Sequence, residues 1–183
     1  MSCYEALAVY YDRLTADVDY QAFADRYEQV FRADGGEFRL LLDLYGTVDA
    51  AFCSLEGINY LSPEQLNALF HRLYLFIRPG GLFLFDIRSP EYLAGLDGDT
   101  FVDEDDNVFC LWRADFDPEM DALVYGMDLF SREGRLWRRS REEHIEYAHS
   151  VSGLSELLGK HGFSDFSSLE AEDRVFVRCR RGK

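Results

Sequence analysis

Apolar positions along the chain recur with two different spacings, which separate predicted helices from predicted strands. The helical spacing of three and four residues predicts four helices, over residues 4–14, 19–33, 63–77 and 151–161. Short runs that are almost entirely apolar predict strands buried on both faces of a sheet, over residues 38–42, 48–53 and 82–87. Because a helix separates the last two runs, we expect these runs to form adjacent parallel strands.

The predicted helix over residues 63–77 has the clearest boundaries. Ser62 is suited to the N-cap position, Pro63 occupies the first turn, and Gln65 is placed to complete a capping box. The Pro-Gly-Gly sequence at residues 79–81 is expected to end this helix before the next strand begins.

Residues 100–141 show no helical period. Alternating polar and apolar positions predict three strands there, over residues 108–116, 123–132 and 136–147. Turn residues separate them, so we expect an antiparallel meander. Two further runs, residues 163–167 and 174–179, are placed to close the main sheet as an antiparallel hairpin. The whole pattern predicts one α/β domain over residues 1–183 with a β-rich insertion at residues 100–147.

Composition narrows the function classes. The 183 residues include 19 Lys and Arg against 34 Asp and Glu, a net charge of −15, which disfavours nucleic-acid binding. No apolar run approaches the roughly 20 residues that cross a bilayer, and no signal peptide is evident. The four cysteines form no CxxC motif, which fits reduced thiols in a cytoplasmic protein. The acidic residues 103–106 lack the ligand spacing of a calcium loop, so we expect a solvated loop and no metal site.

The order of these segments resembles the class I S-adenosylmethionine-dependent methyltransferases, especially the small-molecule type with a β-rich insertion after the fifth strand. Four segments carry the likeness: YEALAVYYDRL at residues 4–14, VDAAFCSLEGINYL at 48–61, LYLFIRPGGLFLFDIRSP at 73–90 and EEHIEYAHSVSGLSELLGKHGF at 142–163. They match that family's lid helix, fourth strand, fifth strand with its preceding helix and turn, and the end of its insertion. The resemblance implies a Rossmann-like, doubly wound, mostly parallel sheet, here incomplete.

The resemblance also implies methyl transfer from S-adenosylmethionine to a small-molecule acceptor. The residues that it places around the cofactor are Tyr4, Tyr11, Asp43, Gly46, Cys53, Ser54 and Leu55. The residues that it places on the acceptor side are Asn59, Tyr60, Arg88 and His144. It assigns no catalytic residue and no metal, and the aromatic meander is a candidate homodimer surface.

One part of the family pattern is missing. The run at residues 38–42 looks like the family's first strand, yet the fourth-strand run begins at Val48, with one glycine, Gly46, where the family has several. Neighbouring parallel strands need a connection of about a dozen residues or more, usually through a helix. The five residues 43–47 span at most roughly 17 Å, so they cannot make this connection.

Three explanations are open: residues missing between Leu44 and Tyr45, a real deletion with a rearranged sheet edge, or antiparallel pairing of residues 38–42. We favour the first and expect a backbone discontinuity at or near Leu44 and Tyr45. A real deletion would favour the alternative function, a non-catalytic methyltransferase-like remnant that acts as a structural or regulatory partner.

Overall fold

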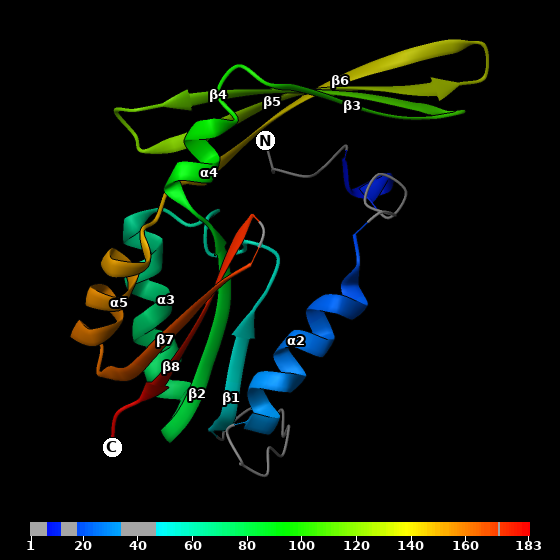
Figure 1. Ribbon diagram of the computed structural model, residues 1–183. Coiled ribbons are helices and arrows are strands. Elements are labelled where there is room, and N and C mark those ends of the chain that lie inside the picture. Colours follow the sequence, from blue (N-terminus) through cyan, green and yellow to red (C-terminus); the bar gives the residue numbers. More distant parts are fainter. Residues whose placement is uncertain (1–6, 12–17, 34–46, 172) are drawn as a thin grey trace. The chain divides into compact units, whose positions relative to one another are not determined.

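Figure 1 shows the computed structural model, which describes residues 7–11, 18–33, 47–171 and 173–183. The chain divides into two compact units. Unit 1 contains Met1–Asp19 and Glu91–Ala148, and unit 2 contains Tyr20–Pro90 and His149–Lys183. The predicted insertion, residues 100–147, lies within unit 1. The predicted discontinuity at Leu44 and Tyr45 and the predicted strand at residues 38–42 lie outside the described residues.

Unit 2 is built on a four-stranded sheet in the order β1-β2-β8-β7. The strands are β1 (Val48–Cys53), β2 (Ile77–Arg88), β7 (Phe163–Ala171) and β8 (Arg174–Arg181). β1 and β2 are parallel neighbours, which confirms the expected pairing of the two apolar runs.

The sheet of unit 2 is less parallel than the sequence predicts. Among the described strands only β1 and β2 pair in parallel, while β8 pairs with both β2 and β7 in antiparallel fashion. The short connection between β7 and β8 turns the chain back beside itself and permits only antiparallel pairing of these two strands. The expectation of a closing hairpin was therefore right, and the expectation of a mostly parallel sheet is wrong for the described part of the chain.

Helices cover both faces of this sheet (Figure 1). α3 (Pro63–Phe76) and α5 (Val151–Lys160) pack on one face, and α2 (Tyr20–Ala33) packs on the other. The alternation along β2 explains the arrangement, because Phe83 and Phe85 join the core with α3 and α5 while Leu84 joins the core with α2. Complete burial of each such side chain contributes about 1.5–3 kcal/mol.

The junction between α3 and β2 differs in part from its prediction. The capping box at Ser62 and Gln65 is present, as expected. The helix ends at Phe76 and the strand begins at once, so the Pro-Gly-Gly sequence lies inside β2 instead of forming a turn between them. These residues are taken up by a bulge, because β1 advances from Val48 to Ala50 while β2 advances from Ile77 to Leu82.

Unit 1 contains a separate antiparallel sheet in the order β3-β4-β5-β6, which confirms the predicted meander. The strands are β3 (Thr100–Asp105), β4 (Val108–Asp117), β5 (Ala122–Glu133) and β6 (Leu136–Tyr147). One face of this sheet is covered by two short helices. Leu7 of η1 (Leu7–Val9) packs near Cys110, and Leu93 of α4 (Pro90–Gly95) packs near Ala114.

The edge strand β3 is missing from the predictions, which place the acidic residues 103–106 in a solvated loop. In the structure Asp103, Glu104 and Asp105 belong to the strand. The apolar side chains of Phe101 and Val102 are 40% and 52% exposed, so β3 has no alternation of buried and exposed positions to reveal it. The predicted helix over residues 4–14 is represented in the described residues by the turn η1. Among the described helices, none is both long and apolar enough to cross a membrane.

Candidate functional site

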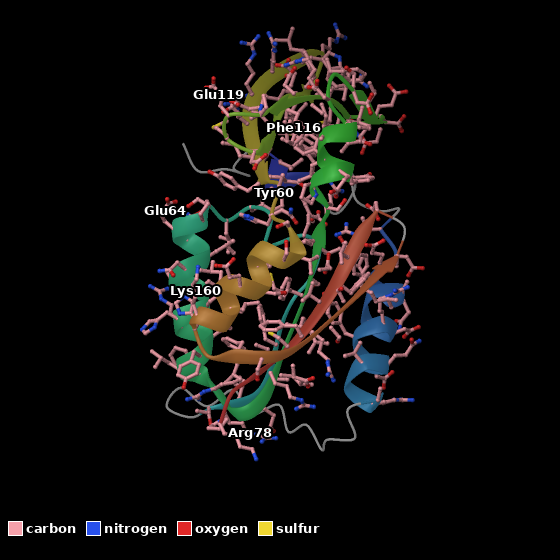
Figure 2. The ribbon with its side chains drawn as sticks, turned by 60° about the vertical axis from the view of Figure 1, so that its left-hand side comes forward. Tyr60, Glu64, Arg78, Phe116, Glu119 and Lys160 are labelled. Carbon is pink, nitrogen blue, oxygen red and sulfur yellow. The ribbon has the colours of Figure 1, made fainter. Side chains whose placement is uncertain are left out.

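The strongest candidate site in unit 2 is the loop that follows β1. Parallel strands β1 and β2 end at the same edge of the sheet, and ligands of open α/β sheets bind outside the carboxyl ends of their strands. The predicted site residues found at this edge are Cys53, Ser54, Leu55, Asn59, Tyr60 and Arg88. In Figure 2, Tyr60 and Glu64 lie at one end of unit 2, and Arg78 lies at the opposite end.

Asp86 of β2 anchors this loop. Its side chain is fully buried, and its two oxygens accept four hydrogen bonds. Oδ1 accepts from the Tyr27 hydroxyl at 2.6 Å and from the Leu55 backbone N–H at 3.0 Å. Oδ2 accepts from the Glu56 backbone N–H at 3.0 Å and from Arg174 Nη1 at 2.8 Å. These bonds fill the roughly four acceptor positions of a carboxylate. Asp86 therefore holds neighbouring groups of the protein and has no acceptor position left for a ligand.

The anchored backbone is unusual. Leu55 and Glu56 have φ values of +57° and +46°, in the left-handed region that residues other than glycine rarely adopt. Such a conformation costs on the order of 1–3 kcal/mol per residue and persists only where the surroundings enforce it. Asp86 accepts both amides, and the Glu56 carboxylate forms an ion pair with Arg174. The same three charged side chains therefore hold the turn in place.

Asn59 ties the far side of the loop to β2. Its Nδ2 donates to the Arg88 carbonyl at 3.1 Å, and its Oδ1 accepts from the Arg88 N–H at 3.0 Å. The Asn59 side chain is fully buried. The structure thus shows Asn59 joining the loop to the end of β2, while its expected contact with a methyl acceptor stays a prediction.

The chain is similar in sequence and in fold to proteins named as methyltransferases. No protein-family model matches the chain. YqeM of Bacillus subtilis (strain 168), named as a proposed methyltransferase, is 24% identical over 158 residues, which cover 80% of this chain and 64% of YqeM. GWCH70_2453 of Geobacillus sp. (strain WCH70), also named as a proposed methyltransferase, is 24% identical over 76% of this chain and 62% of its own length. The chain thus spans less than two thirds of these curated relatives.

A match to a solved structure covers more of this chain. An S-adenosylmethionine-dependent methyltransferase from Clostridium acetobutylicum ATCC 824 is 26% identical, with a TM-score of 0.65, and the match covers 89% of this chain and 72% of that one. The chain is related to the class I S-adenosylmethionine-dependent methyltransferases. CalS10, an amino pentose methyltransferase from Micromonospora echinaspora, shares the fold with a TM-score of 0.62 at 16% identity, over 77% of this chain and 61% of its own.

Cys53 lies at the end of β1, and its thiol is partly buried. Burial, and then the nearby Asp86 carboxylate, raise the pKa of its thiol to about 11. Burial, and then Asp86, also raise the pKa of Tyr27, so that its hydroxyl remains a hydrogen-bond donor. Both raised pKa values favour the protonated forms of Cys53 and Tyr27 at neutral pH.

The remaining predicted site residues fall into two groups. Tyr11 and His144 belong to unit 1, where Tyr11 is exposed and His144 is buried in β6. His144 Nε2 lies 3.4 Å from Glu142 Oε2, and burial lowers the pKa of His144 against the opposing effect of Glu142. Tyr4, Asp43 and Gly46 lie outside the described residues.

Sequence reasoning missed three members of the Asp86 network: Tyr27, Glu56 and Arg174. The available signal was Asp86 itself, a charged residue at the end of an apolar run. In the structure Asp86 holds the loop after β1. Its partners come from distant segments, and only the fold brings them together.

Unit 1 has a second acidic centre that the sequence did not indicate. Asp128 of β5 is 3% exposed and lies within hydrogen-bonding distance of three guanidinium groups. The distances are 2.9 Å to Arg113 Nη2, 2.6 Å to Arg139 Nη2 and 3.1 Å to Arg141 Nε. Burial tends to raise the pKa of Asp128, but the three arginines lower it overall.

The sheet face that carries Asp128 also holds a hollow of about 450 Å³. Its lining consists of Glu104, Asp105, Asp106, Phe109, Phe130 and Trp137. No group of three His, Cys, Asp or Glu side chains in the described ranges is arranged to hold a metal ion.

Proposed function

We propose that the whole protein transfers a methyl group from S-adenosylmethionine to a small-molecule acceptor. The observation that carries the proposal is the match over 89% of the chain to the Clostridium methyltransferase, at 26% identity and a TM-score of 0.65. Two curated relatives named as proposed methyltransferases support the same reaction class. The acceptor remains a proposal, as does the homodimer through the meander.

The chemistry of the loop after β1 fits the edge of a nucleoside site. When bound, S-adenosylmethionine supplies an electrophilic methyl group on a positively charged sulfonium. The loop amides of Leu55 and Glu56 already donate to Asp86, so contacts with a cofactor fall to partly exposed side chains and to backbone carbonyls. Cys53, Ser54 and Leu55 present a thiol, a hydroxyl and an isobutyl group, which suit a largely apolar aromatic ring with polar edges.

On the acceptor side we propose Tyr60 and Arg88 of unit 2. His144 belongs to unit 1, and its expected place on the acceptor side stays a prediction from the sequence. The fold neighbours CalS10, an amino pentose methyltransferase, and KedS8, a sugar N-methyltransferase, share the architecture at 16% and 18% identity. At that distance they support the fold and leave the acceptor of this chain open.

Calorimetric titration with S-adenosylhomocysteine tests the proposal. Wild-type protein is expected to bind, and Ser54→Trp is expected to weaken binding at least about tenfold because the indole would occupy the cofactor edge. Ser164→Trp is the matched control. Ser164 is exposed on β7 and pairs with Arg180, which pairs in turn with Leu82 in the middle of β2, away from the Arg88 end.

Three results would count against the proposal. Absence of wild-type binding at millimolar ligand would favour the non-catalytic alternative. Equal loss of affinity in both variants would remove Ser54 from the site. Unchanged affinity in a folded Ser54→Trp variant would do the same.

A further inference from the structure

The loop after β1 is held by a buried network whose members do not face the proposed cofactor. Asp86 is fully buried and receives four hydrogen bonds, two of them from the loop backbone. This saturation leaves it no acceptor position for a ligand. Any effect of Asp86 on a bound molecule must therefore pass through the atoms that it holds.

Arg174 connects the carboxylate to the loop by a second route. Its Nη1 donates to Asp86 Oδ2 at 2.8 Å and also pairs with the Glu56 carboxylate. The guanidinium carbon lies 5.0 Å from the centre of the Phe23 ring, within range of a cation–π contact with α2. The side chain of Arg174 is 13% exposed, so these contacts form largely away from solvent. Planar guanidinium geometry allows one side chain to join two carboxylates and an aromatic face.

The backbone that this network holds would not adopt its conformation unaided. Leu55 and Glu56 both have positive φ, and both donate their N–H groups to Asp86. Removal of the carboxylate would leave two amides without their acceptor and would release two strained residues toward ordinary conformations. Tyr27 differs from them, because its hydroxyl joins α2 to Asp86 at 2.6 Å and to the Cys53 carbonyl at 3.4 Å, and neither bond involves the amides of Leu55 and Glu56.

We propose that Asp86 and Arg174 are positioning residues for cofactor binding, which set the loop 54–57 without touching the ligand. The inference rests on the proposed function, since it assigns the ligand of that loop. It separates two kinds of contact at Asp86: the bonds to Leu55 and Glu56 govern affinity, and the bond to Tyr27 governs attachment of α2.

The test compares Asp86→Asn with Tyr27→Phe in the full chain. The Asn variant keeps the shape but directs an NH₂ group at donors, and we expect S-adenosylhomocysteine affinity to fall roughly ten- to a hundredfold. Tyr27→Phe removes the short bond to Asp86 and the longer contact with the Cys53 carbonyl but keeps both bonds to the loop amides, so we expect its affinity to stay within about threefold of wild type while its thermal midpoint falls. A merely structural role for Asp86 would make affinity follow thermal stability equally in both variants.

Amide hydrogen exchange supplies a readout that needs no ligand. Exchange at Leu55 and Glu56 should accelerate at least about tenfold in Asp86→Asn and remain slow in Tyr27→Phe, with Met127 in unit 1 unchanged in both. If wild type fails to bind, the proposed function fails, and exchange alone then decides whether Asp86 positions the loop.

Two outcomes would overturn the inference. One is a folded Asp86→Asn variant with wild-type exchange at Leu55 and Glu56. The other is wild-type affinity in that variant when the parent protein binds. If Asp86→Asn does not fold, Arg174→Lys takes its place, because it keeps the charge but replaces the planar guanidinium, whose Nη1 contacts both Asp86 and Glu56, with a compact ammonium group. It should then show a several-fold loss of affinity, and no loss would reject the proposal.

Discussion

Each unit buries one aspartate that is held by arginine, but the two aspartates hold different things. Asp86 in unit 2 receives two backbone amides, one phenol and one guanidinium. Asp128 in unit 1 is surrounded by three guanidiniums whose side chains are 44–69% exposed. The first carboxylate bonds directly to a loop, and the second bonds to side chains on the surface of a sheet.

The two sites differ in the other contacts that hold the groups hydrogen-bonded to each aspartate. The arginines around Asp128 come from β4 and β6, which are already registered against β5 along their whole length. Without Asp128 these strands keep their backbone ladders. The loop after β1 has no such ladder, and Leu55 and Glu56 are in a conformation that other contacts must enforce. Removal of a buried carboxylate should therefore change the structure most where few other contacts hold the groups that are hydrogen-bonded to it.

The largest expected effect is on stability after removal of each carboxylate. Asp86→Ala should lower the free energy of unfolding by about 3–5 kcal/mol, because it takes the acceptor from two backbone amides and a buried phenol and leaves the buried Arg174 with Glu56 as its one remaining partner in this network. Asp128→Ala should cost only about 1–2 kcal/mol, since half-exposed arginines can turn to water.

Spectroscopic probes can assign these losses to the units. The two tryptophans of the chain, Trp112 and Trp137, both lie in unit 1, so their fluorescence reports that unit. Helical circular dichroism reports mainly α2, α3 and α5, which lie in unit 2. Urea unfolding followed by both signals should show Asp86→Ala mainly in the dichroism and Asp128→Ala mainly in the fluorescence. Equal losses in the two variants would break the comparison.

A smaller effect is expected in the response of Asp128 to acid. Its pKa lies below the ordinary value of 3.8, so its ion pairs stabilise the folded state above that pH. The contribution is lost as the pH falls through the lowered pKa of the folded state. The urea midpoint of wild type, followed by tryptophan fluorescence, should exceed that of Asp128→Asn by a constant margin between pH 7 and 5. The margin should narrow below pH 3.8, and a margin that widens in acid would contradict the assignment.

The smallest expected effect concerns a single arginine of the Asp128 centre. Arg141 is 69% exposed, and Asp128 keeps two other guanidiniums when it is removed. Arg141→Gln should therefore change the unfolding free energy by no more than about 1 kcal/mol, measured by the same fluorescence titration. A loss as large as that of Asp128→Ala would show that the three arginines act as one unit.

Local patterns predicted the elements better than their partners. The bounds of β1 and β6 and the cap of α3 follow from neighbouring residues, and the structure reproduces them. β3 was not predicted because both of its faces are exposed, at Phe101 and Val102, so its sequence has no alternation of apolar and polar positions. The bulge at residues 79–81 depends on how β2 pairs with β1, and this pairing cannot be predicted from the sequence of β2 alone.

The candidate site shows the same division. The sequence located the loop at Cys53, Ser54 and Leu55, because a strand end is a local feature. It did not find Tyr27 or Arg174 as partners of Asp86, since these residues meet only through the packing of α2 and the pairing of β8 with β2. Prediction of such a network needs the register of strands that lie far apart in the sequence.

The strand order β1-β2-β8-β7 has a consequence for synthesis on the ribosome. β2 emerges early, but its partner β8 is translated only after the whole of residues 91–148. Until then Phe83 and Phe85 lack the neighbours Cys179 and Val177 that face them across the sheet. One edge of β2 therefore stays without its partner strand in the nascent chain for about the time needed to make 90 residues, or some 5–20 seconds. A cell that makes this protein would need to shield that apolar strand during this interval.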